Sequence, residues 1–337
     1  MEIALTAGED EKHLQFIRQL GLSHVVSGAS ISEKGIIELE TLKRRKDYFE
    51  SQGLQWDVIE NLPPLSYNKV MFGIEGRDKQ IENVCQSIEN IGNAGINVLQ
   101  YQWMLLGGLR TEYSPTGRGG ARYPRFDMKV AEHMPAACLD WLGKGPHAHP
   151  YPHVPDRKMS SSEVWSNLVY FLERIVPVAE NAGVRLAVHP DDAPVSSFMG
   201  VSRILIDWDG LQRAIDSVPS KHNGLGFCMG TIGTMEKLNV PKAIKHFGDQ
   251  NKIFFAHFRN PRGSVPVFDE VFPDEGDIDM VEAVRAFRKV AYNGVIRIDH
   301  CPGVIGDNSH SDRSFAFQVG YLKGLIQTLE ELGETTG

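Results

Sequence analysis

Long apolar runs are absent from this 337-residue chain, and cysteine is scarce. No apolar stretch approaches the roughly 20 residues that a membrane-spanning helix needs, so we expect no association with a membrane. The N-terminus, MEIALTAGED, has no basic segment followed by an apolar one, which predicts that a secretory signal is missing and that the protein is cytoplasmic. The four cysteines form no CxxC pair, which favours reduced thiols over a disulfide framework; they are Cys85, Cys138, Cys228 and Cys301.

An excess of positive charge is also absent. The formal net charge is −8, whereas proteins that bind nucleic acid through its phosphates concentrate lysine and arginine. We therefore expect no nucleic-acid partner and predict a small-molecule ligand. The length and the 42% content of hydrophobic residues are sufficient for a large buried core.

Short β-branched or aromatic segments alternate with segments of helical periodicity along the whole chain. Eight such strands are expected, at Ile3–Ala7, His24–Ser27, Gln55–Glu60, Asn97–Trp103, Arg185–His189, Gly224–Cys228, Ile253–His257 and Val295–Asp299. Strands that alternate with helices indicate a parallel sheet, either open or closed. The segment after the first strand has neither a GxGxxG nor a GxxxxGK[ST] loop, and eight units favour closure. The sequence thus predicts one α/β domain over residues 1–337, a (β/α)8 TIM barrel.

A long segment rich in Gly, Pro, Arg and His follows the fourth predicted strand, at about residues 105–159. It is too long for an ordinary connection between a strand and a helix. Insertions of this kind in barrels lie on the catalytic face, so we predict that it forms a lid or a wall of the substrate site.

Four of the predicted strands end in side chains that commonly bind metals. RLAVH ends in His189, GLGFC in Cys228, IFFAH in His257 and VIRID in Asp299. The carboxyl ends of successive barrel strands surround one pocket, so these side chains are expected to converge although about 30 to 40 residues separate them.

Two imidazoles, a thiolate and a carboxylate are suitable ligands for Mn²⁺, Fe²⁺, Co²⁺ or Zn²⁺, and poor ligands for Mg²⁺. A single histidine or cysteine at a strand end is more often a packed core residue than a ligand. Four in register on consecutive units favour a metal site.

Two further side chains are candidates for the chemistry. His300 follows Asp299 directly and could act as a general base or acid, although a structural histidine bonded to a loop carbonyl is an equal alternative at this point. Arg259 could clamp a substrate carboxylate with two parallel hydrogen bonds, or could form a surface ion pair.

Extended segments of the chain resemble the mannonate dehydratase family of the xylose-isomerase-like barrel superfamily. The similarity is carried by RKDYFESQGLQWDVIENLP, RDKQIENVCQSIENIGNAGINVL, RLAVHPDDAP, NGLGFCMGTIG, HFRNPRG, EVFPDEGDIDM, IRIDH and VGYLKGL. It covers most of the chain outside the predicted insertion.

The resemblance implies that His189, Cys228, His257 and Asp299 bind one metal ion, usually Mn²⁺. It implies removal of water from D-mannonate to give 2-keto-3-deoxy-D-gluconate, with His300 transferring a proton and Arg259 orienting the carboxylate. It also implies a homodimer. Candidates for contact with the sugar-acid substrate lie in or near the matching segments, at Arg110, Asp191, Asn260 and His310.

Two segments depart from the family pattern. No tyrosine lies between Asp299 and Tyr321, where the family has a Pro-Gly-Tyr segment, so the acid for the departing hydroxyl is expected to be His310 or a metal-bound water. LLGGLRT replaces an Asp-Trp pair before Arg110. These departures leave open a different aldonate, or isomerisation or epimerisation of a sugar or sugar acid on the same barrel.

Overall fold

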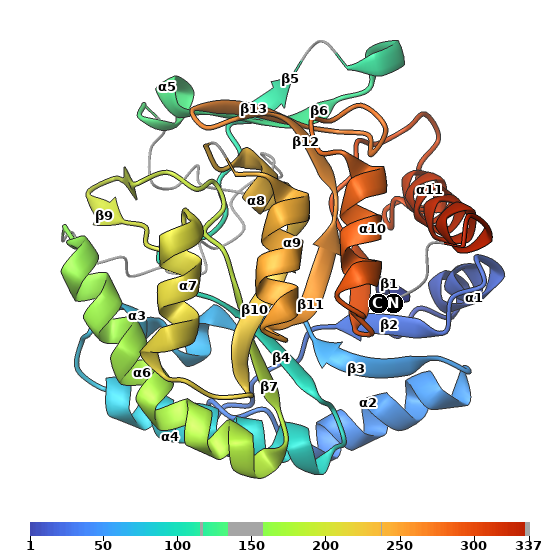
Figure 1. Cartoon of the computed structure of the whole chain (residues 1–337). Coiled ribbons are helices and arrows are strands. Elements are labelled where there is room, and N and C mark those ends of the chain that lie inside the picture. Colours follow the sequence, from blue (N-terminus) through green and yellow to red (C-terminus); the bar gives the residue numbers. More distant parts are fainter. Residues whose placement is uncertain (115–116, 134–157, 237, 334–337) are drawn as a thin grey trace.

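The computed structural model describes residues 1–114, 117–133, 158–236 and 238–333. Within these residues, eight parallel strands close into a barrel in the order β1-β14-β11-β10-β7-β4-β3-β2 (Figure 1). They are β1 (Glu2–Thr6), β2 (His24–Ser27), β3 (Gln55–Ile59), β4 (Val98–Gln102), β7 (Arg185–His189), β10 (Asn223–Cys228), β11 (Ile253–Phe258) and β14 (Val295–Ile298). The predicted barrel is confirmed, and the strand bounds agree with the predicted ones to within one residue.

A long helix follows each barrel strand and packs on the outside of the barrel (Figure 1). These helices are α1 (Glu11–Gln19), α2 (Leu39–Ser51), α4 (Arg77–Asn93), α6 (Ser161–Ala182), α7 (Trp208–Ser217), α9 (Val240–Asp249), α10 (Met280–Lys289) and α11 (Asp312–Glu331). Among the described residues, none of the helices combines the length and the hydrophobicity needed to cross a bilayer.

Local sequence signals determine where these helices begin and end. Helix α6 begins with a capping box. The Ser160 side chain accepts a hydrogen bond from the backbone N–H of Glu163, and the Glu163 carboxylate accepts one from the backbone N–H of Ser160. It ends at Gly183, whose φ of 71° is a left-handed conformation that glycine adopts without strain. The chain then turns directly into β7.

Strand alternation divides the barrel interior into an apolar lower level and a polar upper level. The lower level includes Ala4, Val26, Val58, Val98, Ala187, Phe255 and Val295. Side chains two residues further along a strand point to the same face, so the next interior positions toward the carboxyl ends include Thr6, Glu60, Gln100, His189, His257 and Arg297. Polar chemistry is therefore confined to one end of the barrel.

The predicted insertion contributes to a second sheet at that end (Figure 1). Strands β5 (Glu112–Ser114) and β6 (Tyr123–Asp127) join the hairpin β12 (Asn260–Ser264) and β13 (Val267–Val271) in the antiparallel order β12-β13-β6-β5. Because β12 begins two residues after β11 ends, this sheet lies beside the carboxyl ends of the barrel strands. Residues 115–116 and 134–157 of the predicted insertion lie outside the described residues.

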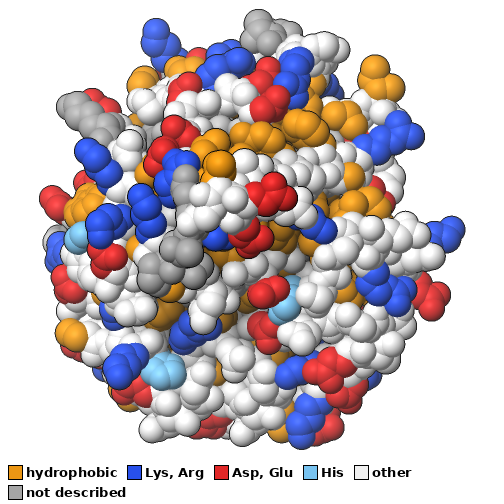
Figure 2. Space-filling view, turned by 45° about the vertical axis from the view of Figure 1, so that its right-hand side comes forward, with side chains coloured by type: hydrophobic (Ala, Val, Ile, Leu, Met, Phe, Trp, Pro, Cys, Tyr) orange, Lys and Arg blue, Asp and Glu red, His pale blue; other side chains and the backbone are white. Residues whose placement is uncertain are grey.

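Short elements complete the connections. They are η1 (Pro64–Ser66), α3 (Asn68–Phe72), η2 (Arg118–Gly120), α5 (Met128–Ala131), β8 (Ser197–Phe198), β9 (Val201–Ser202) and α8 (Met229–Thr234). On the face in Figure 2, basic and acidic side chains are interspersed, and its described residues form no continuous basic strip of the kind that binds phosphate backbones.

Candidate active site

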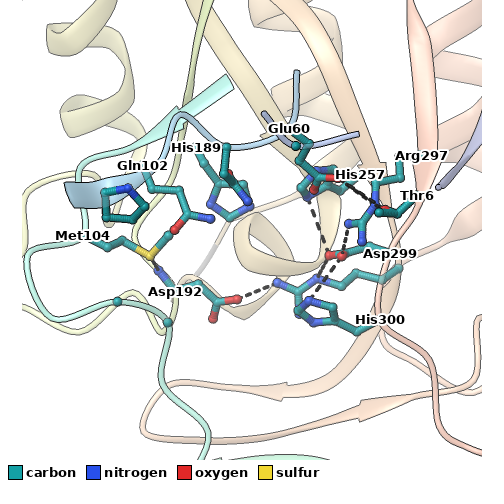
Figure 3. A pocket seen from close by; sticks show the side chains of 16 residues that line it. Thr6, Glu60, Gln102, Met104, His189, Asp192, His257, Arg297, Asp299 and His300 are labelled. Atoms are coloured by element: carbon teal, nitrogen blue, oxygen red, sulfur yellow. Dashed lines mark hydrogen bonds and ion pairs between the residues drawn. The ribbon is translucent and has the colours of Figure 1, made fainter. Parts of the chain in front are cut away.

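A cavity of about 420 Å³ opens at the carboxyl ends of the barrel strands (Figure 3). Its lining includes five of the predicted site residues, namely His189, His257, Arg259, Asp299 and His300. A volume of this size suits a small molecule.

Three of the four predicted metal ligands form a tight cluster. One ligand atom each from His189, Cys228 and His257 lies within 4.8 Å of the others, and all three side chains are buried. The fourth, Asp299, lies beside them, with Oδ2 3.6 Å from His257 Nδ1. The convergence predicted from strand ends is thus present for the first three residues, with Asp299 adjacent.

The two imidazoles are prepared for a metal in different ways. His189 Nδ1 lies 2.7 Å from the carbonyl oxygen of Pro190, so this nitrogen donates and Nε2 keeps its lone pair. Neither ring nitrogen of His257 makes a well-oriented hydrogen bond within the described part of the chain. His257 Nε2 does lie 3.0 Å from Glu60 Oε1 as an ion pair. A buried imidazole without hydrogen bonds, beside a thiol and a second imidazole, fits a divalent metal.

Cys228 is held as a thiolate by its surroundings. Its sulfur accepts from Thr231 Oγ1 at 3.2 Å and from Arg259 Nη2 at 3.3 Å. Burial favours the neutral thiol, but the Arg259 guanidinium and the two neighbouring imidazoles hold the pKa of Cys228 well below its ordinary value. The thiolate is the form that binds metals.

Asp299 lies among two arginines and a histidine. Its carboxylate is 2.8 Å from Arg259 Nε, 2.5 Å from Arg297 Nη1 and 3.2 Å from His300 Nε2. Burial opposes ionisation, but His300, His257 and the two arginines hold the pKa of Asp299 well below its usual range. The carboxylate is therefore ionised and available as an oxygen ligand.

His300 is oriented by a carboxylate that the sequence did not indicate. Its Nδ1 lies 2.9 Å from Glu270 Oε1, and about a quarter of its side chain is exposed to the cavity. Burial raises the pKa of Glu270, but Arg110, His300 and Arg259 outweigh it and lower this pKa to about 2. An ionised Glu270 fixes the His300 ring and leaves Nε2 as the nitrogen that can exchange a proton.

Arg259 is not placed as the predicted carboxylate clamp. Its Nη2 donates to Asp192 Oδ2 at 2.7 Å and to Thr231 Oγ1 at 2.8 Å, and its Nη1 binds Glu270. Its Nε lies 2.8 Å from Asp299, and only 3% of the side chain is exposed. With all three nitrogens engaged by the protein, Arg259 holds the site together and has no free edge for a substrate.

The family model for D-mannonate dehydratase (UxuA) matches residues 1–335. The chain belongs to the D-mannonate dehydratase family. Mannonate dehydratase of Thermotoga petrophila is 30% identical over 349 residues, which cover 96% of each chain. Mannonate dehydratase 2 of Halalkalibacterium halodurans is 27% identical over 338 residues, which cover 95% of this chain and 96% of the relative.

Comparison with solved structures supports the same family membership. A mannonate dehydratase from Streptococcus suis serotype 2 superimposes with a TM-score of 0.86 at 26% identity, covering 100% of this chain and 97% of the other. A D-tagatose 3-epimerase-like protein superimposes with a TM-score of 0.59 at 16% identity, covering 98% and 100%. The second likeness shows only a shared fold, so it does not favour the epimerase alternative.

Two of the predicted substrate contacts, Asp191 and Arg110, lie behind the cavity wall. Asp191 accepts from the backbone N–H groups of Ile204 and Leu205 at 3.0 and 2.8 Å, which fixes a loop and turns its side chain away from the cavity. The next residue, Asp192, lines the cavity instead. Arg110 is fully buried and donates to both carboxylate oxygens of Asp192 at 2.8 and 2.9 Å. It acts on the site through Asp192.

The other two predicted substrate contacts also lie outside the cavity lining. Asn260 ties the β12 hairpin together, accepting from the backbone of Ile278 at 3.0 Å and donating to the carbonyl of Pro273 at 2.8 Å. His310 stacks on His13 with ring centroids 4.3 Å apart, and its Nε2 lies 3.1 Å from Asp10. The structure therefore gives both residues structural partners in place of a substrate.

Sequence reasoning missed several charged residues in or beside the cavity of this mannonate dehydratase family member. They are Glu60, Asp192, Glu270 and Arg297. Glu60 and Arg297 each lie two residues after an apolar interior residue, Val58 and Val295. Strand alternation alone could therefore have predicted that both side chains face the barrel interior. Glu270 comes from the β13 strand of the added sheet, and its position depends on how that sheet folds over the barrel.

Proposed function

We propose that the chain catalyses the dehydration of D-mannonate to 2-keto-3-deoxy-D-gluconate and water. The observation that carries the proposal is the convergence of His189, Cys228 and His257 in one cavity, in a chain that the D-mannonate dehydratase family model matches over residues 1–335. The names of the three mannonate dehydratases compared above support the same reaction.

The proposed cofactor is Mn²⁺, with Fe²⁺, Co²⁺ and Zn²⁺ as alternatives. His189, Cys228, His257 and Asp299 would hold it, because they combine two imidazoles, a thiolate and an ionised carboxylate at one wall of the cavity. When bound, the cation supplies Lewis-acid polarisation of substrate oxygens.

The protein's own contribution to the reaction is proton transfer by His300. We assign to it removal of the proton on the carbon beside the carboxylate, since its ring borders the cavity and Glu270 fixes its orientation at 2.9 Å. That C–H bond and the C–O bond of the next carbon break, and a carbon–carbon double bond forms between them. The resulting enol then becomes the 2-keto product.

The departing hydroxyl needs a proton, which we also assign to His300. In the described part of the chain no tyrosine lines the cavity, and His310 lies outside it. After the first step, His300 carries the abstracted proton beside the substrate and can return it to the leaving oxygen. One histidine thus serves both steps, with Arg259 as a positioning residue.

The remaining expectations extend this proposal. We propose that the insertion at about residues 105–159 walls the substrate site within one barrel domain, since Gly107 and Gly108 line the cavity. The homodimer and the cytoplasmic location stay predictions. Light scattering coupled to size-exclusion chromatography measures the molar mass in solution and so tests the homodimer.

The test is turnover of D-mannonate by purified protein loaded with Mn²⁺, followed by a thiobarbiturate assay for the 2-keto-3-deoxy acid. His300→Asn should lower kcat about 10²- to 10⁴-fold while metal content stays unchanged. Turnover that persists after complete removal of metal would contradict the mechanism. Deuterium incorporation from heavy water without loss of a hydroxyl would favour the isomerase or epimerase alternative.

A further inference from the structure

Two arginine side chains border the cavity, and they differ in what their nitrogens contact. Arg259 hydrogen-bonds to protein acceptors through both of its Nη atoms, and its Nε lies 2.8 Å from Asp299 as an ion pair. Arg297 comes from β14, and 14% of its side chain is exposed. Its Nε donates to Thr6 Oγ1 at 2.6 Å and lies 3.0 Å from Glu60 Oε2, and its Nη1 binds Asp299. Among the described residues, none accepts from its Nη2.

The position of Arg297 is held on three sides. Thr6 on β1 and Glu60 after β3 both contact its Nε, and Asp299 after β14 contacts its Nη1 (Figure 3). A guanidinium fixed in this way loses little conformational entropy when it binds a ligand. The Nη2 edge is left as a prearranged donor.

The chemistry of the cavity requires such a donor. Three carboxylates line it, at Glu60, Asp192 and Asp299, and each is already paired with a guanidinium of the protein. The carboxylate of a ligand therefore needs a directed donor of its own. A sugar acid is anionic through its carboxylate. Asp299 is also the metal-ligand candidate that contacts Arg297, so a carboxylate on Arg297 would lie beside the reacting carbons.

We propose that Arg297 recognises the carboxylate of the sugar acid and thereby determines that the enzyme takes aldonates in preference to neutral polyols. This inference rests on the proposed function for the substrate class, and it replaces Arg259 in the role of carboxylate clamp. Thr6 and Glu60 are positioning residues that act through Arg297.

The experiment compares binding of C6 aldonates and the corresponding neutral alditols to Mn²⁺-loaded protein by isothermal titration calorimetry. D-gluconate and D-galactonate are paired with D-glucitol and galactitol, and D-mannonate is followed by kcat and KM. Arg297→Gln should weaken aldonate binding about 10- to 100-fold, the range for a lost charge-assisted hydrogen bond, and leave alditol binding unchanged. Arg297→Lys should recover part of the preference. Arg262→Gln, which removes an exposed charge outside the cavity lining, serves as the matched control.

Metal content by inductively coupled plasma mass spectrometry and the unfolding temperature are measured on every variant. A wild-type protein that binds aldonates no better than alditols overturns the proposal. So does an Arg297→Gln variant that loses its metal, or that weakens both ligand classes equally, because either result assigns Arg297 a structural role. If wild type prefers aldonates but does not dehydrate D-mannonate, the proposed function fails while the carboxylate recognition stands.

Discussion

Replacement of Cys228 by alanine should weaken Mn²⁺ binding about 100-fold and leave the barrel folded. Sites with four protein ligands bind structural Zn²⁺ with roughly 10–16 kcal/mol, so an average ligand contributes about 3–4 kcal/mol, or about 10²- to 10³-fold in affinity. Mn²⁺ binds such donors more weakly than Zn²⁺, which favours the lower end of that range.

The structure adds a second cost to the same substitution. Cys228 is fully buried, and its thiolate faces the Arg259 guanidinium at 3.3 Å. Removing it leaves Arg259 with one anionic partner fewer and leaves the Thr231 hydroxyl without its acceptor at 3.2 Å. We therefore expect a lower unfolding temperature even in the metal-free protein. Cys228→Ser should restore the Thr231 contact but little of the metal affinity, since a hydroxyl is a poorer ligand.

The assay is calorimetric titration with Mn²⁺, combined with metal analysis after dialysis. Cys85→Ala is the matched control, because Cys85 is half-buried on α4 and its thiol points to the carbonyl of Arg174 at 3.8 Å, away from the cavity. Equal stoichiometry and affinity in Cys228→Ala and wild type would refute the ligand assignment.

Three further perturbations test the rest of the site. Chelation should abolish turnover, and Mn²⁺ at about 100 times its Kd should restore it and stabilise the fold by about 2.7 kcal/mol, seen as a rise of a few degrees in unfolding temperature. Glu270 has a pKa of about 2 in place of 4.5, so the unfolded chain binds more protons between these values. The free energy of unfolding should accordingly fall as the pH drops from 4.5 toward 2, and less so in Glu270→Gln, as measured by urea titrations at stepped pH. His310→Ala should keep kcat and KM within about threefold of wild type in the thiobarbiturate assay, and a larger loss would return His310 to the substrate site.

The barrel and the strand ends were predictable because parallel strands impose a register that sequence periodicity displays. His189 and Cys228 close strands β7 and β10, and His257 lies one residue before the end of β11. A closed barrel brings such positions to one pocket whatever the connecting segments do. Their convergence needed no knowledge of the loops.

The loop residues were not predictable in the same way. Asp191 and Asp192 are neighbours in an irregular segment. Long-range bonds decide which carboxylate faces the cavity, because Ile204 and Leu205 hold Asp191 while Arg110 holds Asp192. Glu270 reaches His300 because the β12–β13 hairpin pairs with β6 of the insertion, a long-range contact without a local signal. Sequence periodicity does not predict the orientation of a side chain where long-range pairing determines it.

Charge balance links the metal site to the arginines. The buried groups of the site whose pKa values favour ionisation are four carboxylates and one thiolate, opposed by three guanidiniums and by the His257 imidazole, whose pKa is raised to about 9; they are Glu60, Asp192, Glu270, Asp299, Cys228, Arg110, Arg259, Arg297 and His257. With His257 neutral, as a histidine that binds a metal must be, this set carries two negative charges, which one divalent cation neutralises. Burial makes an uncompensated charge costly. A site that is neutral with its metal bound has no net attraction for an anionic substrate. Recognition of the sugar-acid carboxylate therefore depends on directed hydrogen-bond donors. Among the described residues lining the cavity, Arg297 presents a guanidinium edge without a protein acceptor.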